Sequence, residues 1–446
     1  MEFNFAFVSL ILLINIQGFL TSTYSLPVKC EYENICAVRE TKVTLKCFYL
    51  NINIKTVFWF SHKQRTNWRN KDEPEDLTLD SDYSGRVNQE IKNSSSYLTI
   101  SDLIERDSGE YQLMFIMKDG VKHLSSVTVN LTVTVLQVRK HKKNLTCDTS
   151  CPLTSKPQHI YWKKDGQYIA ESESKEFSLS SAAYSCFLSP DLKISSDYLC
   201  LSNSGCWGVT YTSRRVCALV GSTVDIHSSY SHPTADTVEK TYWHVPNNVL
   251  DLRDVYQFAG RVEYINNTLR IKDINMSDSG EYRFRIITNT DSYSESPGVI
   301  LTVTDTQVIS SPGTVSEREK VILSCSTKCT LDKNIKYSWY KNGRLVTDGF
   351  KLYNKLYLDS VSSEEIQEYS CAVRDESVEI SAFEHFYIFL IVFVVQIFII
   401  AAIWVWFCLK KSRLKKQIND KNEETPTSIM FSCTSAVPPT EPDYVN

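Results

Sequence analysis

The 446-residue chain lacks the short motifs on which most enzymes depend. It has no glycine-rich loop of the kind that cradles a phosphate, no His-Glu-x-x-His pair and no nucleophile elbow. Its eight histidines are scattered singly, apart from His227 and His232, and two histidines near one turn are more often surface residues than metal ligands. We therefore expect no enzyme activity, no cofactor and no bound metal.

An excess of charge of one sign is also missing. The chain has 48 Lys and Arg against 52 Asp and Glu, and no long basic stretch lies in its bulk. Proteins that bind nucleic acid usually present a basic face, so we expect no nucleic-acid partner. Glycine (14) and proline (13) are too few for a low-complexity chain, whereas tyrosine (24) and phenylalanine (20) are plentiful.

Two apolar runs predict how the chain is placed in the cell. Residues 5–19 are apolar and are followed by small and polar residues, which is typical of a signal peptide over residues 1–25. Glu2 stands where such peptides usually carry a positive residue. The alternative, an N-terminal membrane anchor, would need a longer apolar run.

The second run, residues 386–409, contains no charged residue and is long enough to cross about 30 Å of hydrocarbon. A basic cluster, residues 410–416, follows at once and favours a cytoplasmic C-terminus. These features predict a single-pass type I protein of the plasma membrane, with residues 26–385 outside the cell.

Cysteine and glycosylation patterns agree with an extracellular bulk. Twelve of the 14 cysteines fall between residues 26 and 385, where disulfide bonds are expected. The same region holds the Asn-x-Ser/Thr sites, which are candidate glycosylation sites: Asn93, Asn130, Asn144, Asn266 and Asn275.

The pentapeptide Asp-Ser-Gly-Glu-Tyr occurs twice, at residues 107–111 and 278–282. Alternating apolar residues flank both copies, which predicts strand, tight corner, strand. The tyrosine suits a tyrosine corner, in which its hydroxyl bonds back to the chain. Arg86 and Arg261 lie upstream, and we expect each to pair with the aspartate of its copy.

Four tryptophans in short aromatic strands predict an all-β chain of tandem immunoglobulin-like sandwiches. From each tryptophan to the next corner tyrosine the separations are 52, 22, 39 and 30 residues; the long ones suit variable-type (V) domains and the short ones C2-type domains. The pairs are Trp59–Tyr111, Trp162–Tyr184, Trp243–Tyr282 and Trp339–Tyr369. The predicted order is a V domain (26–135), a C2 domain (136–189), a linker (190–205), a V domain (206–304), a C2 domain (305–377), one transmembrane helix (386–409) and a short disordered tail (410–446).

The duplicated cysteine spacing predicts four disulfides. A Tyr-x-Cys corner in each C2 domain predicts the core bridges Cys147–Cys186 and Cys325–Cys371. Matched leftover cysteines predict bridges between neighbouring domains, Cys36–Cys151 and Cys217–Cys329. The partners of Cys30 and Cys47 stay open, and Cys200 and Cys206 are candidates for a small loop between the two V–C2 units.

The second V–C2 unit resembles the sialic-acid-binding immunoglobulin-type lectins (siglecs), and within them the fish B-cell sialic-acid receptor-like group. The resemblance covers about residues 206–373 and is weaker over residues 26–189. It is carried by four stretches: Trp-Gly-Val at 207–209, Val-Cys-Ala-Leu-Val-Gly-Ser-Thr-Val at 216–224, Tyr-Arg-Phe-Arg at 282–285 and Leu-Ser-Cys-Ser-Thr-Lys-Cys at 323–329.

The resemblance implies a receptor for sialylated glycans in immune-cell adhesion or recognition. It implies that Arg285 holds the sialic acid carboxylate, while Trp207 and Tyr293 cover other parts of the sugar. Two departures stand against it: the outer V domain has Met114 where the inner one has Arg285, and Ser228 and Asn267 stand where the family has cysteines on two strands.

Two other functions stay open as alternatives. The chain is then either an immunoglobulin-type receptor for a protein ligand that has lost the sugar site, or a decoy with little signalling. Arg285 belongs to the third domain, beneath another V–C2 unit, so glycan binding would need a bend between the units or a ligand on the same cell.

The tail contains one tyrosine, Tyr444, in the sequence Asp-Tyr-Val-Asn. Phosphorylation there would create a Tyr-x-Asn site for an SH2 adaptor. An unmodified, solvated tyrosine is the equal alternative.

Overall fold

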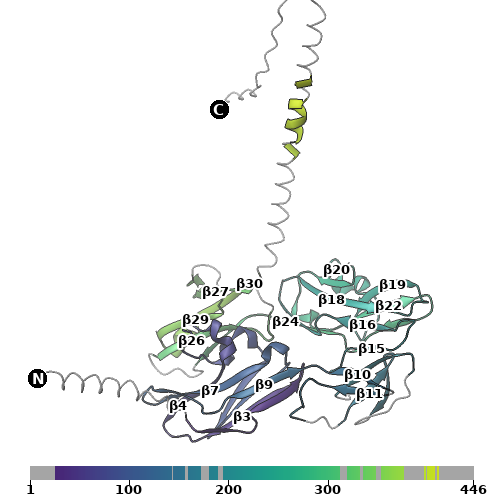
Figure 1. The fold of residues 1–446 in the computed structure, drawn as a ribbon. Coiled ribbons are helices and arrows are strands. Elements are labelled where there is room, and N and C mark those ends of the chain that lie inside the picture. The colour runs from purple at the N-terminus through teal and green to yellow at the C-terminus, as the bar shows by residue number, and fades with distance from the viewer. Residues whose placement is uncertain are drawn as a thin grey trace, which may run out of the picture. The chain divides into compact units, whose positions relative to one another are not determined.

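The structure is a computed structural model, shown in Figure 1. It describes residues 26–142, 144–155, 159–171, 180–188, 194–311, 319–331, 335–347, 353–375, 396–397, 399–406 and 409–410. The chain divides into two compact units, Met1–Asp375 and Glu376–Asn446. Within the described part of the first unit, the strands form tandem β-sandwiches, as the tryptophan and tyrosine pattern predicts.

Domain 1 (residues 26–135) packs two sheets face to face. The first sheet has the order β1-β3-β6-β5, and the second has the order β2-β9-β7-β4, with β8 also paired to β7. The strands are β1 (Val28–Cys30), β2 (Asn34–Val38), β3 (Val43–Tyr49), β4 (Ile54–Ser61), β5 (Val87–Lys92), β6 (Ser95–Ile100), β7 (Gly109–Met117), β8 (Lys122–Leu124) and β9 (Val129–Thr134).

Domain 3 (residues 206–304) repeats this topology. Its sheets have the orders β16-β18-β21-β20 and β17-β24-β22-β19, with β23 paired to β22. The strands are β16 (Gly208–Tyr211), β17 (Arg215–Leu219), β18 (Val224–Ser231), β19 (Val238–His244), β20 (Val262–Ile265), β21 (Thr268–Ile271), β22 (Gly280–Thr288), β23 (Ser292–Ser294) and β24 (Val299–Thr304).

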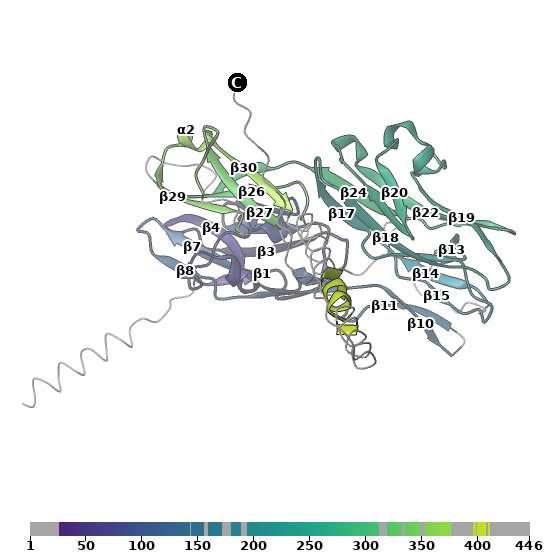
Figure 2. The ribbon, with the colours of Figure 1, turned by 90° about the horizontal axis from the view of Figure 1, so that it is seen from above.

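Domains 2 and 4 are smaller. Domain 2 has the sheets β10-β11 and β13-β12-β14-β15, and domain 4 has β25-β26-β29 and β28-β27-β30. The strands are β10 (Gln137–His141), β11 (Asn144–Asp148), β12 (Tyr161–Lys164), β13 (Gln167–Glu171), β14 (Ala183–Phe187), β15 (Leu199–Cys200), β25 (Gln307–Ser311), β26 (Glu319–Ser326), β27 (Ile335–Lys341), β28 (Arg344–Leu345), β29 (Lys355–Val361) and β30 (Tyr369–Asp375); the short helix α2 is Ser363–Ile366. Figure 2 shows β13, β14 and β15 beside strands of domain 3.

A tryptophan lies at the centre of each core. Trp59, Trp162, Trp243 and Trp339 are at most 2% exposed. Burying each such indole removes roughly 150–250 Å² from water, which makes these residues the anchors of their sandwiches. The four aromatic strands therefore have the role that the sequence predicts for them.

Both predicted tyrosine corners are present. Tyr111 donates its hydroxyl hydrogen to the Asp107 carbonyl at 2.6 Å, and Tyr282 does the same with Asp278 at 2.6 Å. The expected arginine–aspartate pairs are bidentate: Arg86 donates to Asp107 at 2.7 and 2.9 Å. In domain 3 the corresponding distances from Arg261 to Asp278 are 2.8 and 2.9 Å.

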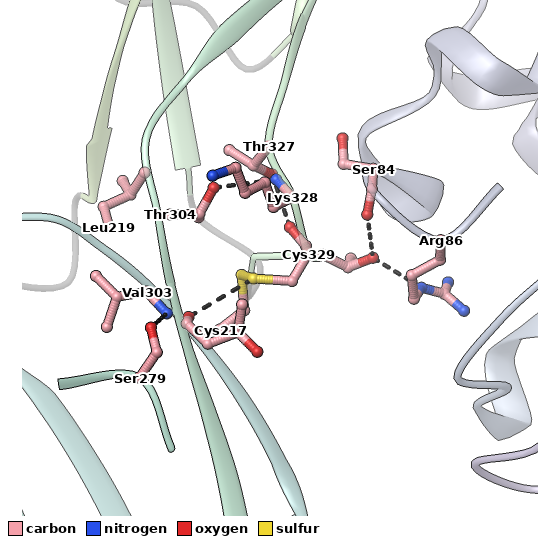
Figure 3. Close-up of a disulfide and its surroundings, with 12 residues drawn as sticks. Ser84, Arg86, Cys217, Leu219, Ser279, Val303, Thr304, Thr327, Lys328 and Cys329 are labelled. Carbon is pink, nitrogen blue, oxygen red and sulfur yellow. Dashed lines mark hydrogen bonds between the residues drawn. A yellow bond between two sulfur atoms is a disulfide. The ribbon is translucent and has the colours of Figure 1, made fainter. Parts of the chain in front are cut away.

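Six disulfides join the described cysteines of the first unit. Four are the pairs that the duplicated spacing predicts: Cys36–Cys151, Cys147–Cys186, Cys217–Cys329 and Cys325–Cys371. Figure 3 shows the bridge between Cys217 and Cys329 and its surroundings. Cys30 bonds to Cys47, opposite it in the β1–β3 pair, and Cys200 bonds to Cys206.

The predicted linker over residues 190–205 is too long. Leu199–Cys200 form strand β15, which pairs with β14, and Leu199 and Leu201 pack against the core of domain 2. Domain 2 therefore continues to about residue 201. The prediction failed because two residues are too few to show an alternating pattern.

The remaining predictions about the chain ends fall largely outside the described residues. The expected signal peptide (1–25) and tail (410–446) are not described, except for Lys410. Within the expected span, residues 396–397, 399–406 and 409 are described, and they are helical. Among the described residues, no helix has the length and apolar character needed to cross a membrane.

Candidate functional site

Strand β22 carries the candidate anion-binding arginine. Tyr282, Phe284 and Ile286 point into the core and are at most 1% exposed, so Arg283 and Arg285 point to the outer face of the sheet. This alternation is the pattern that a half-buried strand needs. The outer face of the β17-β24-β22-β19 sheet is therefore the surface on which a ligand of Arg285 would lie.

The two arginines of this face differ in their partners. Arg283 donates from Nε to the Glu281 carboxylate at 2.7 Å. Arg285 donates from Nη2 to the Ser292 hydroxyl at 2.8 Å, whereas its Nε–H is buried and has no acceptor in the described part of the chain. A buried donor without an acceptor costs free energy, and a movement of the Arg285 side chain that exposes this donor would let an external acceptor pair with it.

His244 lies on the same face, since it is opposite Arg283 in the β19–β22 pair. It is 4% exposed, and its ring contacts the Ser294 hydroxyl at 2.9 Å and the Val245 carbonyl at 3.0 Å. Burial lowers the pKa of His244, and the positive charges of Arg285 and Arg283 lower it further. His244 therefore adds no positive charge to the face at neutral pH.

Trp207 and Tyr293 lie together, but not on the face of Arg285. Their rings stack with centroids 5.8 Å apart. Tyr293 is opposite the buried Ile286 in the β22–β23 pair, whereas Arg285 is opposite Ser294. Because residues paired across a ladder share a face, Tyr293 points away from the outer face, and the expectation that these aromatics flank Arg285 is not met.

The Trp207–Tyr293 stack lies instead at the junction with domain 2. A Cβ added to Gly166, in the turn between β12 and β13, would lie 2.9 Å from the Tyr293 ring. The nearby Lys163 of domain 2 donates to the Ser296 carbonyl of domain 3 at 2.6 Å. Tyr293 thus packs against domain 2, and Trp207 stacks on Tyr293.

Domain 1 has no arginine at the position that matches Arg285. Met114, at the place of Arg285, is 5% exposed and packs with Phe58, Phe60 and Trp68. This apolar cluster lies on the outer face of β4 and β7. The sequence predicts the missing arginine but not the cluster, because Trp68 lies in an irregular segment without a periodic pattern.

In domain 3 a hydrogen bond stands at the place of the missing strand disulfide. Ser228 donates its hydroxyl hydrogen to the Asn267 carbonyl at 2.9 Å. At the matching places in domain 1, Cys47 bonds to Cys30, and Ser96 accepts a hydrogen bond from the Trp59 indole at 2.9 Å. Neither V domain therefore uses the pairing that the resemblance implies.

The candidate glycosylation sites lie at the surface. Asn93 and Asn266 occupy matching two-residue turns, between β5 and β6 and between β20 and β21, with φ of 51° and 55°. Asn130 and Asn275 are also exposed, and Asn144 is half-buried. Tyr444 lies outside the described residues, and the described part of the chain has no cluster of His, Cys, Asp or Glu that suits a metal ion.

Comparison with known families identifies an immunoglobulin domain in one part of the chain. Residues 304–382 match the model of the immunoglobulin domain. No curated protein matches the sequence. The chain is similar in structure to the N-terminal eight Ig domains of Down Syndrome Cell Adhesion Molecule, at 15% identity and a TM-score of 0.23, covering 78% of this chain and 52% of that one.

Two further structures give the same result. Drosophila OTK extracellular domains 3–5 match at 13% identity and a TM-score of 0.19, covering 79% of this chain and 96% of theirs. The titin I-band fragment I67-I69 matches at 16% identity and a TM-score of 0.21, covering 62% and 99%. The chain spans about half of the adhesion-molecule fragment. At these identities and TM-scores, the likenesses carry no conclusion about ligands.

Proposed function

We propose that this chain is a type I cell-surface receptor of the immunoglobulin superfamily that binds sialylated glycans through Arg285 of domain 3. The observation that carries the proposal is the state of Arg285: an outward-facing guanidinium whose buried Nε–H has no acceptor in the described structure. The six disulfides support an oxidising, extracellular setting.

The chemistry of the site suits a carboxylate. Sialic acid is ionised at neutral pH, and a guanidinium can bind a carboxylate with two parallel hydrogen bonds that lysine cannot reproduce. Arg283 already donates to Glu281, so Arg285 has the stronger need for an external anion. Neutral His244 beside it offers a polar ring without competing negative charge.

The proposal is tested with an ectodomain–Fc fusion on cells before and after sialidase treatment. We expect binding to be lost after sialidase and to fall in Arg285→Ala. Arg285→Lys should also bind weakly, because it keeps the charge and loses the paired donors. The matched control is Arg270→Ala, which removes a half-exposed arginine from the other sheet of the same domain.

A second candidate follows from the placement of the aromatics. Because Trp207 and Tyr293 pack at the domain junction, the outer face lacks the covering rings that the siglec resemblance implies. A receptor for a cell-surface protein ligand would need no such rings. Binding that survives both sialidase and Arg285→Ala would favour this candidate and contradict the glycan proposal.

The membrane span over residues 386–409 and the plasma-membrane location belong to the proposal. The length of the apolar run and the basic residues that follow it support them. The same holds for an SH2 adaptor at phosphorylated Tyr444. A phosphorylated tail peptide should capture the adaptor and its unphosphorylated form should not, while failure of both would favour a decoy with little signalling.

A further inference from the structure

An interface that no sequence pattern predicts joins domain 1 to domain 4. Glu75 of domain 1 forms an ion pair with Lys355 of domain 4, with 2.6 Å between oxygen and nitrogen. The two side chains are 8% and 2% exposed, and Tyr357 donates its hydroxyl hydrogen to Glu75 at 2.8 Å. A buried charge without a partner is strongly unfavourable, so each residue requires the other.

Hydrogen bonds extend this interface along one edge of domain 1. The Leu79 carbonyl accepts from the Ser324 hydroxyl at 2.8 Å and from the Asn354 amide at 2.9 Å. Farther along, Arg86 donates from Nε to the Thr330 hydroxyl at 2.8 Å, next to the Cys217–Cys329 disulfide (Figure 3). We call the edge formed by residues 75–86 the closing edge.

Gly85 marks the tightest approach along the closing edge. A Cβ added there would lie 2.0 Å from the Lys328 carbonyl oxygen, a distance that backbone atoms cannot accommodate. The matching glycine of domain 3 is Gly260, with φ of +73° against +69° for Gly85, and a Cβ there would meet nothing within 4 Å. Both positions have a positive φ, which favours glycine. They differ only in whether backbone atoms of domain 4 lie against them.

The duplicated edge of domain 3 has diverged at the contacting positions. Counting back from the matched glycines, Leu250 stands at the place of Glu75, and Tyr256 stands at the place of Ser81, whose side chain forms a hydrogen bond with Tyr337 of domain 4. Leu250 is 59% and Tyr256 is 96% exposed. The two V domains otherwise keep the same corner. The charge of Glu75 on the closing edge is therefore explained by the contact of this edge with domain 4.

Each junction between consecutive domains is bridged by a disulfide. Cys36–Cys151 links domains 1 and 2, Cys200–Cys206 spans the short connection between domains 2 and 3, and Cys217–Cys329 links domains 3 and 4. The closing edge joins domain 1 to domain 4 without a covalent bond. Within this unit, each domain thus contacts at least two others, and domains 1 and 3 also meet through the ion pair between Asp102 and Arg215, at 2.9 Å.

We propose that the closing edge holds domain 1 on domain 4 in solution, so that the end presented to a partner on another cell is the domain 2–domain 3 end. Domain 4 comes last in the ectodomain, next to the proposed span, and domain 1 is retained beside it. The outer face with Arg285 then needs no bend between units to reach a ligand. The identity of that ligand rests on the proposed function, whereas the closure does not.

The closure is tested by small-angle X-ray scattering of the secreted ectodomain, residues 26–375, which includes the described sandwiches and all six disulfides. Glu75→Lys and Lys355→Glu should each increase the radius of gyration, and the double variant should restore the wild-type value. Gly85→Ala should increase it as well, while Gly260→Ala should leave it unchanged. An unchanged radius in both single charge variants, or a double variant that stays expanded, would overturn the proposal.

Presentation is tested with the same ectodomain tethered to vesicles through its C-terminus. A dye is placed at the matched hairpin positions Lys92 of domain 1 or Ile265 of domain 3, and energy transfer to a membrane dye is measured. We expect higher transfer from domain 1 than from domain 3; the reverse order contradicts the proposal. Neither experiment includes a glycan. A negative sialidase test would therefore not affect this inference, and a negative scattering result would not affect the proposed sugar site.

Discussion

At the scale of single residues, the duplicated corners act as a comparison within one chain. Arg86 and Arg261 make the same bonds to aspartate, and both also donate to carbonyls of the preceding turn. The Arg86 side chain is 7% exposed and that of Arg261 is 19% exposed, because domain 4 contacts only the first. The same motif therefore stands in two different environments.

This difference predicts the effect of removing each aspartate charge. Asp107→Asn and Asp278→Asn should both destabilise their domains, by about 3–5 kcal/mol where the remaining arginine is fully buried. The loss should be larger for Asp107→Asn, since Arg86 is the more buried partner. Amide hydrogen exchange measured separately for β7 and β22 checks this, and equal losses in the two domains would contradict it.

The pH dependence of domain 3 follows from its carboxylates. Burial raises the pKa of Asp278 and of Glu281, but hydrogen bonds from Arg261 to Asp278 and from Arg283 to Glu281 outweigh it, so both pKa values lie below their usual range. A lowered folded-state pKa contributes stability above the unfolded value, near 4, and that stability is lost as the pH falls further.

Domain 3 should therefore lose hydrogen-exchange protection as the pH falls from about 5 to 3. Asp278→Asn should flatten this dependence, because it removes the main titrating group of the corner. A wild-type profile that does not change over this range would contradict the assignment.

At the scale of elements, the sequence predicts strands better than it predicts the faces on which distant residues meet. The alternation in β22 is plain from the sequence, and Arg285 is outward as expected. The resemblance implies that Tyr293 lies beside the sugar, whereas the structure turns it to the opposite face, because a shift of one residue in a short strand such as β23 reverses the direction of the side chain. Resemblance alone could not supply that register.

The centre of domain 1 offers a prediction at this scale. Ser96 of β6 accepts the Trp59 indole N–H at 2.9 Å, in a core where both residues are fully buried. Ser96→Ala should destabilise domain 1 by about 1–3 kcal/mol, since a buried donor loses its acceptor. Denaturation followed by Trp-sensitive fluorescence checks this, with the exposed Ser94→Ala as control; no change in Ser96→Ala would contradict it.

At the scale of the whole molecule, local sequence patterns predict the order of the domains. They do not predict the contact between domain 1 and domain 4. The tryptophan and tyrosine spacings count the sandwiches, and the matched cysteines indicate the bridged junctions. Glu75 and Lys355 are 280 residues apart and belong to no repeat, so no periodicity relates them. The expectation that domain 3 lies beneath domain 1 followed from chain order alone.

The measurement that tests the account most directly is nuclear magnetic resonance of the arginine side chains in the ectodomain, titrated with a sialylated trisaccharide. The account predicts that the Nε–H signal of Arg285 shifts on binding, because this donor has no acceptor in the described structure, while the signal of Arg270, already paired with Asp225, stays in place. Saturating glycan that leaves the Arg285 signal unmoved would contradict the account.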